Sequence, residues 1–313
     1  MDRAARRWSR PPGSWGSAGP ACTGSCAPPH ASPARHRDEA LGCGDAFASR
    51  ASALLLTLIL TVVFLVLFAL GVRAAARQIS PIERELTASV LGTQLLVLGL
   101  FFGNFIVAFP AIFSAVGVVS TELENGVLQT IVTRPLSRAA VIGGKYAGLG
   151  ALLALYAALY FGAILAIVRH YTGTSATGEP GALALFCLTP LALLAVTVLG
   201  STSLPTVANG MAVLGLYVVA FVGGMVEQVG ALIDNLTMQR PGIVSGLILP
   251  SDALYRKIVA VLTGSSGGPF MAVRQLGPLG SLSEPSVWMI VYALLYTAAM
   301  VALAIRCFAR RDI

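Results

Sequence analysis

The chain has 313 residues, of which 56% are hydrophobic and only 11% are charged. Soluble globular domains carry about 25% charged residues, so this composition excludes an ordinary soluble domain. The charges fall in the first fifty positions and in a few short segments, which leaves uncharged runs long enough to cross a bilayer. The sequence therefore predicts an all-α integral membrane protein with several spans.

The net charge of +7 is explained better by membrane topology than by nucleic-acid binding. Seven basic residues precede the first apolar run, and Arg306, Arg310 and Arg311 follow the last one. With both termini in the cytoplasm, thirteen basic residues fall inside and eight outside. We expect this orientation. We also expect a multi-pass protein of the plasma membrane that contacts the lipid bilayer and has no nucleic-acid partner.

Residues 1–48 are rich in Pro, Gly, Ser, Ala and Arg and show no apolar periodicity. Such a segment cannot bury enough apolar surface to offset the entropy of ordering, so we predict a disordered tail, separate from a six-span domain at residues 49–313. The tail holds several possible metal ligands, but their spacing fits no common zinc pattern and no metal site is expected. They are Cys22, Cys26, His30, His36 and Cys43.

Six transmembrane helices are expected. They cover residues 51–72, 90–119, 146–168, 182–203, 209–226 and 287–305. The uncharged run from 86 to 121 exceeds the ~20 residues of one straight span and contains Pro110, which predicts a kinked helix leading into a re-entrant or interfacial turn. Gly99 and Gly103 form a G-x-x-x-G step that predicts helix packing.

Residues 227–286 mix charges with short apolar pieces, which predicts a long loop before the last span with partly inserted helices. No charge is expected well inside the six spans, and this disfavours an ion-coupled carrier or a proton relay. We expect the polar side chains of the interior to satisfy helix backbones or to pack helices. They are Asn104, Thr197, Ser201, Thr202, Ser203 and Asn209.

Two catalytic motifs were compared with the sequence, and neither indicates an active site. A P-loop requires G-x-x-x-x-G-K-[ST], whereas the nearest segment has Ala139 in place of the first glycine and Tyr146 in place of the hydroxyl residue. The run from Gly264 to Gly268 matches G-x-S-x-G, but all three histidines precede it and no strand pattern leads into the serine. We therefore predict that the chain is not an enzyme and has no catalytic residue, cofactor or metal of its own.

The polar segment between the second and third spans has the most distinctive pattern in the chain. Glu122 and Glu124 close the second apolar run, a short leucine-containing piece follows, and Gly144 with Lys145 opens the third span. An exposed acidic turn of this kind can pair with basic residues of a soluble partner. On spacing alone, it is equally consistent with charges that only mark a membrane boundary.

This pattern resembles the coupling segment of type-2 ABC transporter permeases. Val127 stands where that family usually carries a threonine, and no convincing amphipathic connecting helix precedes the first span. The resemblance covers about residues 49–313, including the basic end of the chain. The matching positions are Glu122, Glu124, Gly126, Leu128, Pro135, Ser137, Arg138, Gly144 and Lys145.

The resemblance implies the permease subunit of an ABC exporter for an unidentified substrate. A short cytoplasmic coupling helix over residues 122–133 would meet a separate ABC ATP-binding subunit, present in two copies, which binds the ATP and Mg²⁺. The permease would form a homodimer, or a heterodimer with a related permease. Two alternatives stay open: a non-transporting membrane scaffold or accessory protein, and an ion-coupled secondary carrier.

Overall fold

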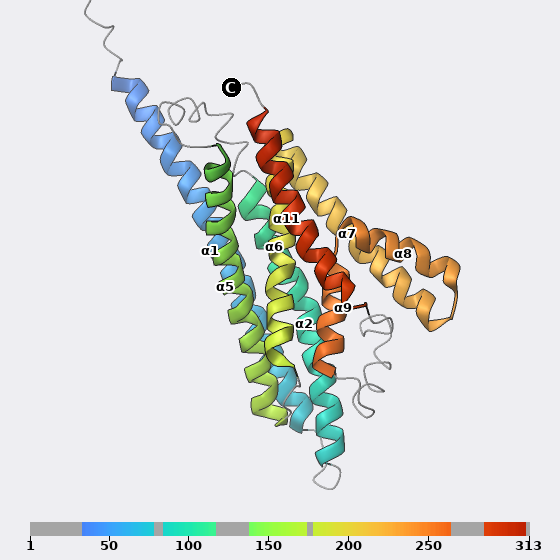
Figure 1. Ribbon diagram of the computed structural model, residues 1–313. Helices are drawn as coiled ribbons and strands as arrows, with labels where there is room; N and C mark the ends of the chain where they lie inside the picture. Colours follow the sequence, from blue (N-terminus) through green and yellow to red (C-terminus); the bar gives the residue numbers. More distant parts are fainter. Residues whose placement is uncertain (1–32, 78–83, 117–137, 174–177, 264–284, 311–313) are drawn as a thin grey trace, which may run out of the picture. The chain divides into compact units, whose positions relative to one another are not determined.

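The computed structural model describes residues 33–77, 84–116, 138–173, 178–263 and 285–310 (Figure 1). The chain divides into two compact units, residues 1–48 and 49–313. Every regular element of the described part is a helix, which confirms the predicted all-α fold. The helices are α1 (Pro33–Arg77), α2 (Arg84–Val116), α5 (Arg138–Thr172), α6 (Glu179–Ser203), α7 (Thr206–Leu232), α8 (Leu236–Ile248), α9 (Ser251–Thr263) and α11 (Trp288–Ala309).

Six of these helices are long and apolar enough to cross a membrane, judged by length and composition. Hydrocarbon of about 30 Å needs about 20 helical residues, and α8 and α9, with 13 residues each, are too short. The prediction of six spans is confirmed. The candidate spans are Leu55–Arg77, Val90–Val116, Ala139–Thr172, Glu179–Ser203, Thr206–Leu232 and Trp288–Ala309.

Several helix boundaries differ from those expected. Helix α1 already begins at Pro33, so residues 33–48 are helical where the sequence predicted disorder. This stretch contains Ala, Arg, Glu and Leu, which are good helix formers, and it runs on without a break into the first span. Helix α5 begins at Arg138, about two turns before the expected start. Only Leu204 and Pro205 separate α6 from α7, as the predicted turn required.

Helix α6 forms the centre of the described helices. It packs against α2, α5, α7, α9 and α11, and 67% of its most apolar window is buried, against 17% for α1. Two apolar clusters surround it. One includes Leu100, Ile164 and Phe186, and the other includes Ile112 and Leu194. The contacts of α6 therefore hold the spans together, whereas α1 leaves most of its apolar side chains exposed.

Helix α2 is continuous, with Pro110 inside it, and the predicted interfacial turn after it lies outside the described residues. Its G-x-x-x-G step faces α5. A Cβ atom on Gly103 would overlap the ring of Tyr160, and the Tyr160 hydroxyl donates a hydrogen bond to the carbonyl of Gly99 at 3.1 Å. The small residues thus let a tyrosine of α5 reach the backbone of α2, which confirms their predicted packing role.

The polar side chains of the α6 core satisfy nearby backbone groups. Thr197, Ser201 and Thr202 each donate a hydrogen bond, at 2.7–2.8 Å, to a carbonyl three or four residues earlier in the same helix. Asn209 of α7 donates to the carbonyl of Thr197 at 3.0 Å. For these residues the expectation of a structural role is confirmed.

Candidate functional site

The predicted coupling segment lies almost wholly outside the described residues. Arg138 is the first residue of α5, although its side chain is not among those described. Lys145 lies two turns further along α5 and is half-buried. The role of these positions stays a prediction. Those outside the described ranges are Glu122, Glu124, Gly126, Leu128, Pro135 and Ser137.

The described part of the chain buries three charged side chains together. Glu227 lies near the end of α7, and Asp252 and Arg256 lie one turn apart on α9. Their exposed fractions are 6%, 8% and 3%. We call these three residues the charge cluster. Charged residues are almost never this deeply buried unless they are paired, so the geometry of the pairing decides what the cluster can do.

Arg256 holds Glu227 through a two-pronged interaction. Nη1 donates to Oε1 at 2.6 Å and Nη2 donates to Oε2 at 2.9 Å. This paired fork is the strongest arrangement available to an arginine and a carboxylate. It joins α9 to α7 across 29 residues of sequence.

Asp252 is held less well. Its Oδ2 atom lies 3.0 Å from Nε of Arg256, yet neither atom makes a hydrogen bond. The contact is therefore an ion pair without hydrogen-bond geometry. Burial raises the pKa of Asp252 to about 6, an effect that Arg256 opposes and Glu227 reinforces. With two carboxylates and one guanidinium, the cluster carries a net negative charge whenever Asp252 is ionised.

Glycines let α7, α8 and α9 approach one another closely enough to bury these charges. Gly224 of α7 faces Asp252, and a Cβ atom there would overlap the carboxylate. Gly242 of α8 faces the side chain of Glu227 in the same way. Helix α8 runs back alongside the C-terminal half of α7 (Figure 1). Larger side chains at these positions would push α8 and α9 away from α7.

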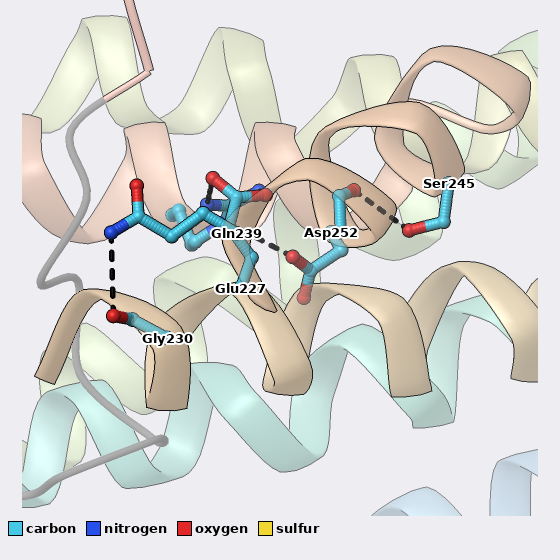
Figure 2. Close-up of polar contacts among 7 residues, drawn as sticks. Glu227, Gly230, Gln239, Ser245 and Asp252 are labelled. Atoms are coloured by element: carbon cyan, nitrogen blue, oxygen red, sulfur yellow. Dashed lines mark hydrogen bonds and ion pairs between the residues drawn. The ribbon is translucent and has the colours of Figure 1, made fainter. Parts of the chain in front are cut away.

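The turn between α7 and α8 is fixed by its own polar contacts. Asp234 adopts a left-handed conformation with φ of 55°, which Asp tolerates better than most residues. The Asn235 side chain caps α8 by accepting a hydrogen bond from the amide of Thr237 at 3.0 Å. Figure 2 shows Gln239 of α8 donating to the carbonyl of Gly230 at 3.3 Å. These contacts hold α8 in register with α7, with Glu227 and Asp252 beside them.

The last carbonyl groups of α8, just before α9, accept hydrogen bonds from the last span. Tyr292 of α11 donates a hydrogen bond to the carbonyl of Leu247 at 2.5 Å, and Tyr296 donates to the carbonyl of Ile248 at 2.7 Å. The last carbonyls of a helix have no partner within the helix. The two tyrosines supply partners and join α8 to α11.

The sequence predicted a long loop with partly inserted helices before the last span, and α8 and α9 are two such short helices. The end of the fifth span differs from the prediction, because the candidate span runs to Leu232 and includes Glu227. Glu227 therefore lies near the end of this candidate span and not well inside it. The predicted fifth span ends at residue 226, just before the first charged residue, Glu227. Pairing with Arg256 allows α7 to continue to Leu232.

Signals for the cluster are present in the sequence but were missed. Asp252 and Arg256 stand at i and i+4, which places them on one face of a helix. Gly223 and Gly224 stand together just before Glu227, at positions where a neighbouring helix approaches. No pattern along the chain, however, indicates which carboxylate Arg256 contacts. Among the described residues, no group of three His, Cys, Asp or Glu side chains is placed to hold a metal ion.

One comparison with known protein families gives a match. A family described as ABC-2 family transporter protein matches residues 50–313. The matched region contains all six candidate spans and the charge cluster. A search of curated proteins found no match.

Proposed function

The chain belongs to the ABC-2 family of transporter proteins, and from this premise we propose that it is the permease of an exporter driven by a separate ATPase subunit. The match over residues 50–313 carries the proposal and makes the chain a multi-pass membrane component of an ABC transporter. Export, the partner subunit and the place where that subunit docks are the parts we add.

We place the docking site on the cytoplasmic segment from Glu122 to Lys145. Its acidic turn and basic end offer charges to a soluble partner. Helix α5 begins at Arg138, directly after this segment. Near its start, Ile142 is buried, and the Tyr146 hydroxyl donates a hydrogen bond to the carbonyl of Leu191 in α6 at 3.2 Å. A movement imposed on the segment would thus pass along α5 to the central helix.

In the proposed cycle, two ATPase subunits close on ATP and Mg²⁺ and move the coupling segments of a permease homodimer or heterodimer. The spans then rearrange around a central path by alternating access. An even number of spans places both termini on one side of the membrane, which we assign to the cytoplasm. The lining offered by the spans suits an apolar or amphipathic substrate.

The test is to isolate the tagged full-length protein from native membranes and to identify co-purifying proteins by mass spectrometry. We expect a P-loop ATPase with the unchanged chain and its loss with Glu124→Arg, because the substitution reverses a charge at the docking surface. The matched control is Glu179→Arg, the same change at the start of α6. Because α5 separates the two sites by one membrane crossing, the control should retain the ATPase.

Two results would contradict the proposal. Reproducible absence of an ATPase with the unchanged chain would favour the scaffold alternative. Retention of the ATPase by Glu124→Arg, with unchanged ATP-driven transport, would show that the coupling segment lies elsewhere.

The charge cluster gives the ion-coupled carrier more support than the sequence did, because one carboxylate is buried near the end of a span and a second is buried beside it. The two mechanisms differ in their energy source. In proteoliposomes that contain the permease and its co-purified ATPase, the exporter requires ATP and ignores an imposed proton gradient. A carrier would instead transport with the gradient alone.

A further inference from the structure

The proposed docking segment does not include the charge cluster, which contains one more carboxylate than its guanidinium can pair well. We propose that Asp252 is a proton-binding site whose occupancy sets how firmly α9 packs against α7. This inference goes beyond the proposed exporter function and does not depend on it. It rests on the positions of Glu227, Asp252 and Arg256.

The first step concerns the charged and titratable groups that face Asp252. On its own helix these are the guanidinium of Arg256 and the phenol of Tyr255, and from α7 they are the carboxylate of Glu227 and the phenol of Tyr217. The charged residue of α8, Arg240, is exposed and is not among the groups that shift the pKa of Asp252. Within their described side chains, α2, α6 and α11 bring no charged group to Asp252.

The second step concerns the pairing. Both Nη atoms of Arg256 are engaged by Glu227, at 2.6 and 2.9 Å. Asp252 is left with Nε at 3.0 Å and with no hydrogen bond on Oδ2. This carboxylate oxygen is therefore buried without the hydrogen bond that would normally stabilise its charge. A proton from water, added to the carboxylate, removes the surplus negative charge and leaves the Glu227–Arg256 pair unchanged.

The third step is the direction of the coupling. Burial raises the pKa of Asp252 from 3.8 to about 6. The packed state therefore binds the proton more tightly than a state in which α9 is exposed to water, so packing strengthens as the pH falls through 6 and reaches its limit below 3.8. Conversely, when α9 separates from α7 at a pH between 3.8 and about 6, a bound proton is released.

Close packing at a glycine links the charge of Asp252 to the position of α9. Gly224 places the backbone of α7 directly against the Asp252 carboxylate, where a Cβ atom would overlap it. Nine-tenths or more of every residue in the charge cluster is removed from solvent. Water cannot therefore solvate the ionised form without moving α9 or α8 away from α7. The charge state of Asp252 and the packing of α9 are consequently linked.

The experiment measures hydrogen exchange of the α9 amides in the full-length protein, in lipid nanodiscs, with rates corrected for the intrinsic effect of pH. Between pH 7.5 and 5.0 the protection of α9 should increase about tenfold, as a pKa shift from 3.8 to about 6 requires. Asp252→Asn keeps the size of the side chain and removes its charge. Its protection should be independent of pH over this range.

The matched control is Asp234→Asn, the same substitution at an exposed residue in the turn before α8. Asn tolerates the left-handed conformation at this position, so the tenfold dependence should remain. The proposal is overturned if the unchanged protein shows no dependence on pH. It is equally overturned if Asp252→Asn shows the dependence of the unchanged protein.

A second variant keeps the test decisive if Asp252→Asn fails to fold. Glu227→Gln removes the competing carboxylate, so that Arg256 becomes free to pair with Asp252 and the pKa of Asp252 falls. The change in protection between pH 7.5 and 5.0 should then shrink to less than about twofold. An unaltered tenfold change would show that another group binds the proton.

Discussion

The α6 core and the charge cluster bury polar groups in two different ways. In α6, each buried hydroxyl bonds to the backbone of its own helix, as Thr197 does to the carbonyl four residues before it. In the charge cluster, Glu227 and Arg256 satisfy each other from different helices, and Asp252 relies on the same arginine. Loss of one partner is therefore a local event in α6, whereas in the cluster it affects two helices, α7 and α9.

Replacing Arg256 should have the largest effect on stability. Arg256→Met leaves two carboxylates buried with no positive charge, and loss of one partner of a buried ion pair costs about 3–5 kcal/mol. Thermal unfolding of the purified protein in detergent at pH 7.5 measures this loss. The control Arg240→Met removes the same charge from an exposed position on α8 and should change stability by less than about 0.5 kcal/mol.

A double substitution sharpens this prediction. Glu227→Gln together with Arg256→Met removes one charge of each sign, so part of the stability lost in the single variant should return. If the two losses simply add, Glu227 and Arg256 do not depend on each other, and the contrast with the α6 core disappears.

Gly224→Ala should have the next largest effect. The added methyl group overlaps the Asp252 carboxylate, and forcing it into this packed site costs about 1–3 kcal/mol. The measurement is again thermal unfolding. Gly215→Ala is the control, because on the same helix its added methyl group would meet no atom within 4 Å. Alanine favours a helix interior by up to about 1 kcal/mol, so this variant should be at least as stable as the unchanged protein.

The physical difference between the two regions explains what could be predicted from sequence. Apolar runs of spanning length, a Pro-containing turn after residue 203 and the packing of Gly99 and Gly103 depend on local composition, and all are confirmed. The charge cluster depends on a contact between residues 29 positions apart. A charged residue taken alone marks a membrane boundary, and only its partner in the folded chain reveals that it is buried.

The same reasoning applies to the predicted coupling positions. Their assignment came from a resemblance of motif, and the matched family includes their segment. A family match identifies the kind of protein, whereas the docking role of Glu122 or Glu124 depends on contacts with a second chain. These roles stay predictions until the partner is isolated.

The smallest effect is expected in the α6 core. Thr197→Val keeps the shape of a fully buried side chain and removes one hydrogen bond to a carbonyl of its own helix. The free energy of unfolding should fall by no more than about 1 kcal/mol. Valine has no hydroxyl that would be left buried without a partner, and the Leu193 carbonyl loses only a second hydrogen bond. Unfolding under the same conditions measures it. A loss as large as that of Arg256→Met would mean that α6 hydroxyls also depend on distant partners.

The two tyrosines of α11 limit how the last span can slide. Tyr292 and Tyr296 stand one helical turn apart and bond to consecutive carbonyls at the end of α8. A small shift of α11 along its axis would break both hydrogen bonds together. The two bonds therefore oppose such a shift. Bringing one tyrosine to the place of the other would need a slide of about 6 Å, the rise of four helical residues. The end of α8 thus fixes the position of the last span along its axis.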